Sequence, residues 1–174
     1  DSLAAADLAP LIHWRPPFAR LGVGLSASGR RDSIAVDLLA GAPEGSAELH
    51  AWLKPAGSAA GRLTLEGLQT AFLIGEPGVV DAAVDFSGTG FTASARQWQM
   101  QGWLHHTLMD TLGLASTDFT ARLDHKTLSL QADAPGEKSR IHATGRLQLE
   151  PDPLYDLQFA AAGVDLARLL DRAQ

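Results

Sequence analysis

Apolar residues occupy every second position through most of this chain. In the cleanest stretch, 80–87, one set of alternate positions carries Val80, Ala82, Val84 and Phe86. The other set carries Asp81, Ala83, Asp85 and Ser87. A period of two is what a β-strand with one buried face requires, whereas a helix repeats every 3.6 residues. The chain is therefore predicted to be built mainly from β-strands.

One six-residue phrase occurs twice. Residues 61–66 read Gly-Arg-Leu-Thr-Leu-Glu and residues 145–150 read Gly-Arg-Leu-Gln-Leu-Glu. The copies start 84 residues apart (145 minus 61), which leaves room for two similar halves, but the segments between them do not repeat. We interpret the copies as two strands of one extended β layer, each with a glycine start, two inward leucines and a charged outer face.

Turn residues divide the alternating pattern into strands at regular spacing. A phase shift at Gly67 predicts a β-bulge. Regular strands separated by turn signals are typical of a sandwich, a barrel or a rolled sheet. The expected strands cover 21–27, 34–38, 47–53, 61–72, 80–86, 91–100, 119–124, 127–132, 140–150 and 154–161.

Three stretches depart from this pattern. Residues 104–112 place leucines at i, i+4 and i+8 before Gly113, which predicts a short helix. Residues 164–173, with Asp165 as N-cap, predict a second helix, and the alanine-rich residues 1–11 fit a helix or a frayed end. The expected fold is mostly β: an antiparallel rolled sheet, sandwich or open barrel with one or two short helices. Residues 1–20 form an N-terminal segment and residues 21–174 a single β-rich domain, with two similar β halves as the alternative.

Composition narrows the classes of function. The net charge of -6 and the scattered arrangement of 14 basic residues argue against binding nucleic acid. The chain has no cysteine, so neither disulfides nor thiolate metal ligands contribute. No apolar run approaches the roughly 20 residues that span a bilayer, and the chain begins at Asp1 without methionine. We expect a processed or trimmed soluble fragment, in which a missing anchor says nothing about the full-length protein.

Catalytic and metal-binding patterns are incomplete. His105, His106 and Asp110 form the one dense cluster, but zinc needs three or four converging ligands. No nucleophile elbow, catalytic cysteine or phosphate-binding glycine loop is present. The paired acids Asp81 and Asp85 lie on the wet face of one strand, where solvated charge is the simpler interpretation. We therefore expect no enzyme activity, no metal and no cofactor.

The candidate partner surface rests on aromatic residues and on the repeated strands. Core anchoring is the favoured interpretation of the tryptophans, with an exposed recognition strip as the alternative. If the repeated strands lie near free sheet edges, a partner can dock there by strand addition, and a proline at Thr64 or Gln148 would impair binding. The candidate residues are Trp14, Phe18, Trp52, Trp98, Trp103, Thr64 and Gln148.

The order of several short motifs resembles a known family. A Trp-Arg-Pro segment at 14–16 leads into the strand 21–25, residues 45–49 read Gly-Ser-Ala-Glu-Leu, and Leu-Glu-Gly-Leu precedes a threonine within 61–70. The second copy of the repeated phrase is followed by Leu-Tyr-Asp-Leu-Gln-Phe at 154–159. In this order, residues 11–170 resemble the periplasmic region of the type II secretion system protein N family.

That resemblance implies the periplasmic domain of an inner-membrane-anchored protein of Gram-negative bacteria. It implies a non-catalytic accessory role in the platform that exports folded proteins, with protein C of the system or the secretin as partners. The competing hypothesis is a lipid-carrying β-groove, as in AsmA-like or lipopolysaccharide-transport proteins. We favour the interaction protein because an apolar groove needs more large side chains than 6% aromatic residues and many strand alanines supply. The oligomeric state stays open.

Overall fold

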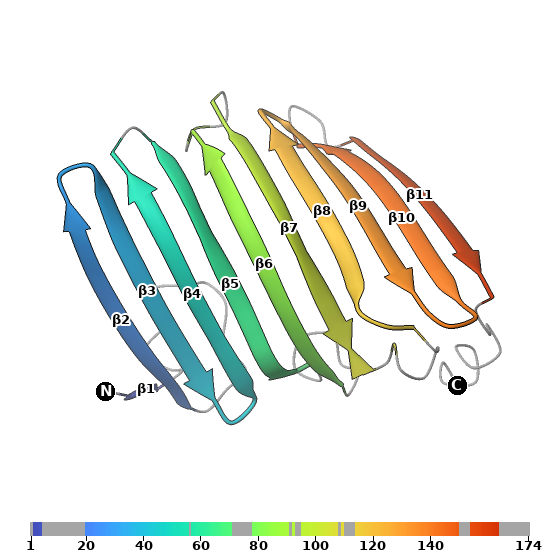
Figure 1. Ribbon diagram of the computed structural model, residues 1–174, viewed down its shortest axis with the longest axis horizontal. Coiled ribbons are helices and arrows are strands. Elements are labelled where there is room, and N and C mark those ends of the chain that lie inside the picture. Colours follow the sequence, from blue (N-terminus) through green and yellow to red (C-terminus); the bar gives the residue numbers. More distant parts are fainter. Residues whose placement is uncertain are drawn as a thin grey trace.

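The computed structural model forms one antiparallel sheet in which every strand pairs with its neighbours in the chain. It describes residues 2–4, 20–55, 57–70, 78–90, 95–107, 114–149 and 154–163, together with Thr92 and Met109. These residues build an 11-stranded sheet in the order β1 to β11 (Figure 1). The predicted mostly β fold is confirmed as a single open sheet, so within the described residues neither the sandwich nor the closed barrel forms.

Most strands are about ten residues long and follow the predicted ranges closely. Short connections such as Arg31 and Asp32, or His125 and Lys126, reverse the chain between neighbours. His125 takes the left-handed φ of 51° that such tight turns require. The strands are β1 (Ser2–Ala4), β2 (Arg20–Arg30), β3 (Ser33–Ala42), β4 (Gly45–Lys54), β5 (Ser58–Gln69), β6 (Val79–Thr89), β7 (Gln97–His106), β8 (Thr117–Asp124), β9 (Thr127–Pro135), β10 (Arg140–Gln148) and β11 (Leu154–Ala162).

The register of the strands separates polar from apolar side chains. Residues directly opposite each other share a face, so each row of partners across the sheet belongs to one face. One row on the polar face runs Ser26, Asp37, His50, Arg62, Asp85, Gln101, Thr120, Gln131, Thr144 and Gln158. A neighbouring row on the apolar face runs Leu25, Leu38, Leu49, Leu63, Val84, Gly102, Phe119, Ala132, Ala143 and Phe159. We call these two sides the polar face and the apolar face.

The predicted bulge lies in β5. The pairing of β5 with β6 shifts register between Leu65 and Leu68, and Gly67 takes a φ of 62°. The backbone N–H of Gly67 donates to Oδ1 of Asp81 at 2.7 Å. Asp81 therefore accepts a hydrogen bond from the backbone N–H that the bulge removes from the ladder. Its role is structural, whereas the sequence suggested only a solvated charge.

Four expectations about local structure are wrong or fall outside the described residues. Residues 104–106 belong to β7 because Leu104 pairs with Ala82 of β6, so the helix does not begin there. Thr107 and Met109 are helical, and the rest of 108–113 lies outside the described residues. The strand does not extend back through Thr92 and Ala95, which close a turn through a 3.0 Å backbone hydrogen bond. Ser2–Ala4 is a strand, not a helix, and residues 164–173 lie outside the described part of the chain.

The buried core is small because the described residues form a single sheet with no second layer packed against it. Among the described residues, the buried apolar side chains are nearly all small, and no large side chain is fully buried. Large apolar residues cover the small ones across the strands. The buried set is Ala51, Ala59, Ala82, Ala83, Leu114, Ala121 and Ala134.

Glycines on the apolar face lie beneath large partners. Gly61 is directly opposite Phe86, and a Cβ on Gly61 would stand 2.7 Å from the Phe86 ring and 2.4 Å from the carbonyl oxygen of His50. Gly88 is covered by Trp98 in the same way. Gly145, at the start of the second repeated phrase, lies beneath Leu157, whose Cδ2 would be 2.7 Å from an added Cβ. The glycine of each repeated phrase therefore makes room for a neighbour on the apolar face.

We predict that Gly61→Ala lowers the free energy of unfolding by about 1–3 kcal/mol, because backbone atoms of β4 and the Phe86 ring of β6 would have to move. Gly145→Ala should cost less, since only the end of the exposed Leu157 side chain must move. Gly41→Ala is the matched control, because an added Cβ there meets nothing within 4 Å. Urea unfolding measures all three, and equal losses for Gly61→Ala and Gly41→Ala would contradict the packing argument.

Candidate functional site

A groove of about 1100 Å³ lies along the polar face of the sheet. It crosses the strands from β4 to β11, and its side chains come mainly from two polar rows. Hydroxyl, amide and guanidinium groups dominate these rows, with Trp52 at the β4 end. The polar-face side chains that line it are His50, Trp52, Ala60, Arg62, Asp85, Ser87, Gln99, Gln101, Thr120, Arg122, Ser129, Gln131, Thr144, Arg146, Asp156 and Gln158.

Both copies of the repeated phrase contribute to this groove in the same way. Arg62 and Arg146, the second residues of the two phrases, both line it. The Nε atom of Arg62 lies 3.6 Å from Oδ1 of Asp85. Nε2 of Gln99 donates to Oγ of Ser87 at 3.0 Å. Neighbouring strands thus satisfy many of the polar groups along the groove.

His50 and Asp37 form a polar pair at the β4 end of the groove. Their ring nitrogen and carboxylate are hydrogen-bonded, and Oγ of Ser26 donates to the other Asp37 oxygen at 3.2 Å. The hydrogen bond from His50, and then that from Ser26, hold the pKa of Asp37 below its ordinary value against the opposing effect of desolvation. The His50 ring also meets the Trp52 ring edge-on with centroids 4.3 Å apart. The His50 side chain is about half exposed on the polar face.

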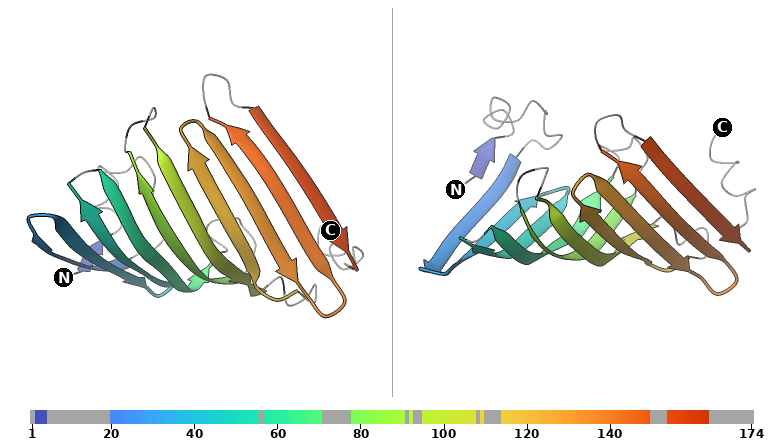
Figure 2. Two further views of the ribbon diagram at one scale, coloured as in Figure 1. Left: turned by 45° about the horizontal axis from the view of Figure 1, so that its top comes forward. Right: turned by 90° about the horizontal axis from the view of Figure 1, so that it is seen from above.

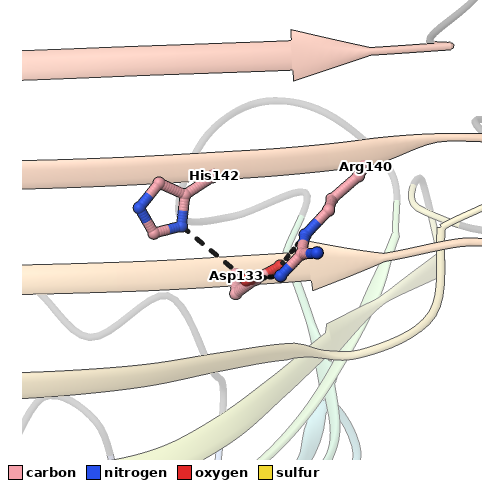
Figure 3. A network of polar contacts seen from close by, with 3 residues as sticks. All are labelled: Asp133, Arg140 and His142. Carbon is pink, nitrogen blue, oxygen red and sulfur yellow. Dashed lines mark hydrogen bonds and ion pairs between the residues drawn. The ribbon is translucent and has the colours of Figure 1, made fainter.

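A second charged cluster joins β9 and β10 (Figure 3). Nε of Arg140 donates to Oδ1 of Asp133 at 3.0 Å, and Nη2 donates to Oδ2. Nδ1 of His142 lies 3.7 Å from the same Oδ2 atom. The hydrogen bonds and positive charge of Arg140 hold the pKa of Asp133 below its ordinary value, and Asp133 reciprocally raises the pKa of Arg140. The cluster links β9 to β10 and favours the ionised form of Asp133.

The apolar face and the last strand expose large side chains. All residues of β11 are exposed. Tyr155, Leu157 and Phe159, on the apolar face, keep 76%, 70% and 70% of their surface in contact with solvent. At the opposite end of the sheet, Leu25 in β2 is 67% exposed. Contiguous exposed apolar residues of this size are typical of interaction surfaces.

Of the described candidate partner residues, Trp52, Trp103, Thr64 and Gln148 lie on the polar face and Trp98 lies on the apolar face. Thr64 and Trp103 line one small pocket. Trp52 and Trp103 lie on the polar face and are 47% and 37% exposed, so core anchoring is wrong for both. Trp98 lies on the apolar face, half-buried, and its Nε1 donates to the carbonyl of Gly90 at 3.1 Å. Trp14 and Phe18 lie outside the described residues.

The repeated strands do not lie at free edges. Thr64 is in β5, between β4 and β6, and Gln148 is in β10, between β9 and β11. A proline at either position would remove a ladder hydrogen bond inside the sheet and act on folding, so the predicted effect on binding loses its basis. The residues that sequence reasoning missed are Tyr155, Leu157 and Phe159. Their alternation was visible, but their place at an edge follows only from the strand order.

The structure places two of the three residues of the histidine cluster. His105 and His106 lie in β7, Nε2 of His106 is 3.1 Å from Oγ1 of Thr70, and Asp110 lies outside the described residues. Within the described ranges, no three His, Cys, Asp or Glu side chains group so as to hold a metal ion. In the same part of the chain, no helix has the length and apolar character needed to cross a membrane.

Comparison with protein-family models, with curated proteins and with solved structures found no match to this chain.

We predict that Arg140→Ala raises the pKa of Asp133, because the variant removes both hydrogen bonds and the nearby positive charge. A carboxyl with a lowered pKa stabilises the fold at pH values above the ordinary pKa of Asp, and this contribution is lost as pH falls through the folded-state value. The variant should therefore lose less stability on acidification than the wild type. Carboxyl NMR titration and acid unfolding measure both effects. Arg146→Ala, on the same strand, is the control and should leave the pKa of Asp133 unchanged.

Proposed function

We propose that this chain is a non-catalytic accessory component of the bacterial type II secretion platform, acting as the periplasmic domain of an inner-membrane-anchored protein. In this role it contacts other assembly components, with protein C of the system or the secretin as partners. The motif order described above supports the proposed family and location. The exposed edge of the sheet supports contact through strand addition as the mode of action.

The observation that carries the contact proposal is the exposure of β11. A strand with one neighbour presents unpaired backbone groups, and natural proteins usually blunt such edges with proline, lysine or a covering element. Residues 154–162 contain neither proline nor lysine, and within the described residues no element lies on the outer side of β11. Tyr155, Leu157 and Phe159 add an apolar stripe beside these groups. Strand addition uses both features, because main-chain hydrogen bonds supply affinity and alternate side chains supply specificity.

The second candidate is a lipid-carrying sheet. The observation that favours it is the apolar face, which continues through ten strands from Leu25 to Phe159. Against it stands the position of the groove, which lies on the polar face and offers hydroxyl, amide and charged groups. A lipid chain would have to lie on the exposed apolar face.

A photo-crosslinking amino acid placed at Tyr155 in secreting cells should capture a secretion component, because this side chain is 76% exposed at the edge of the sheet. The same amino acid at Gln101, on an exposed position of the interior strand β7, is the matched control and should capture much less. Mass spectrometry of the crosslinked product identifies the partner. If neither position captures a secretion component, the secretion proposal is wrong.

Native mass spectrometry separates the two candidate functions. We expect the purified chain to carry no stoichiometric lipid, because the groove lies among the hydroxyl, amide and charged side chains of the polar face. Leu63→Gln, on the apolar face, serves as the comparison. Under the secretion proposal, neither the wild type nor this variant should carry bound lipid. Acyl lipid bound to the wild type and reduced in this variant would favour the lipid-carrying sheet.

A further inference from the structure

The two outermost long strands each lack a neighbour along most of their length. β1 pairs with Arg20, Leu21 and Gly22 of β2, which leaves 23–30 unpaired on the outer side among the described residues. At the other end, β11 pairs with β10 alone. These edges lie at opposite ends of the open sheet (Figures 1 and 2). They are therefore placed to meet edges of other molecules, not each other.

Both edges lack the usual protection against pairing. Residues 23–30 carry one charge, Arg30 at the end, and β11 carries one, Asp156. Neither stretch contains proline or lysine. Edges left this bare accept another strand readily.

Direction and length of the two edges match. Successive strands from β2 to β11 alternate in direction, so β2 and β11 run opposite ways (Figure 1). A second copy that places its β2 beside β11 would therefore continue the antiparallel order. The nine residues of β11 face the eight unpaired residues of β2.

If each row of side chains continues from β11 of one copy into β2 of the next, the register between the two copies is fixed. This register brings compatible side chains together. On the polar face, Ser28 of the second copy would be opposite Asp156, and Ser26 opposite Gln158, so both pairs can hydrogen-bond. On the apolar face, the pairs would be Gly29 with Tyr155, Ala27 with Leu157, and Leu25 with Phe159. On this face the two small residues of β2, Gly29 and Ala27, each meet a large residue of β11.

This size pattern already occurs inside the sheet. Gly61 lies beneath Phe86, Gly88 beneath Trp98 and Gly145 beneath Leu157, each pair directly opposite on the apolar face. Tyr155 over Gly29 of a second copy would repeat it. An aromatic ring covering a cross-strand glycine stabilises such a pair.

We propose that copies of this chain associate head to tail, with β11 of one copy adding to β2 of the next as an antiparallel strand. The proposal deepens the contact role and rests on the same edge of β11. Because the two edges differ, the contact is heterologous and leaves a free edge at each end of a chain of copies. A single copy offers one edge of each kind.

The test uses the full chain and two edge variants in analytical ultracentrifugation over a range of concentrations. The wild type should form a concentration-dependent series of oligomers. Leu157→Lys places a positive charge on the apolar face of β11, and Ala27→Lys places one on the apolar face of β2. Each should weaken self-association at least about tenfold. Both positions are exposed, and circular dichroism checks that both variants stay folded.

Mixing the two variants distinguishes head-to-tail pairing from other contacts. The Leu157→Lys copy keeps an intact β2 and the Ala27→Lys copy keeps an intact β11, so these two edges can still pair. At the other contact the two introduced lysines would stand opposite each other and repel, so the mixture should form a one-to-one dimer that grows no further. Gln101→Lys adds the same charge to the polar face of the interior strand β7, away from both edges, and should associate as the wild type does.

Three results would overturn the proposal: a wild type that stays monomeric at every concentration, an Ala27→Lys variant that dimerises alone, or equal loss in Leu157→Lys and Gln101→Lys. Since the assay contains only this chain, a negative result leaves the contact with secretion components to its own crosslinking test.

Discussion

The structure depends on one constraint: each strand pairs with its neighbours along the chain, in a register that keeps the rows of side chains continuous across the sheet. Because every long strand pairs with the next strand along the chain, the period of two in the sequence becomes two chemically distinct faces. A slip of one residue in any strand would move the side chains of that strand to the opposite face of the sheet. In β5, for example, Leu63 would move from the apolar to the polar face. The only register shift among the described pairings lies beyond Leu65, where Gly67 and Asp81 absorb the extra residue without disturbing the rows.

A single layer has consequences for stability. In a sandwich the apolar face would be covered by a second sheet, whereas here the described residues bury mainly alanines between larger neighbours. Cross-strand pairs such as Phe86 over Gly61 and Trp98 over Gly88 supply packing that a second layer would otherwise provide. Charged pairs such as Asp133 with Arg140 join strands on the polar side. The sheet is therefore held by contacts between adjacent strands, and its two ends lack half of those contacts.

The sequence predicted much of this arrangement and missed what depends on strand order. Alternation located nearly every long strand, and the phase shift at Gly67 located the bulge, because both are local properties of the chain. The leucines at 104 and 108 suggested a helix, but pairing of Leu104 with Ala82 decided the conformation at residue 104. Trp52 was interpreted as a core anchor because a large ring alone does not tell which face is covered. Whether Thr64 or Tyr155 lies at an edge depends on the order of strands in the whole sheet, so it could not be predicted from local sequence patterns.

The polar groove is the larger concave feature, yet the apolar side has more free energy to gain from a macromolecular partner. Groups in the groove already have neighbours, as with Arg62 near Asp85 and Gln99 bonded to Ser87. A ligand there would exchange existing hydrogen bonds for new ones, and the net gain per bond is about 1 kcal/mol. Covering exposed apolar surface is worth about 25 cal/mol per Å², and Tyr155, Leu157 and Phe159 keep most of theirs. Because the same residues adjoin unpaired backbone, an added strand gains on both counts, which places the favoured contact at the end of the sheet and not in its groove.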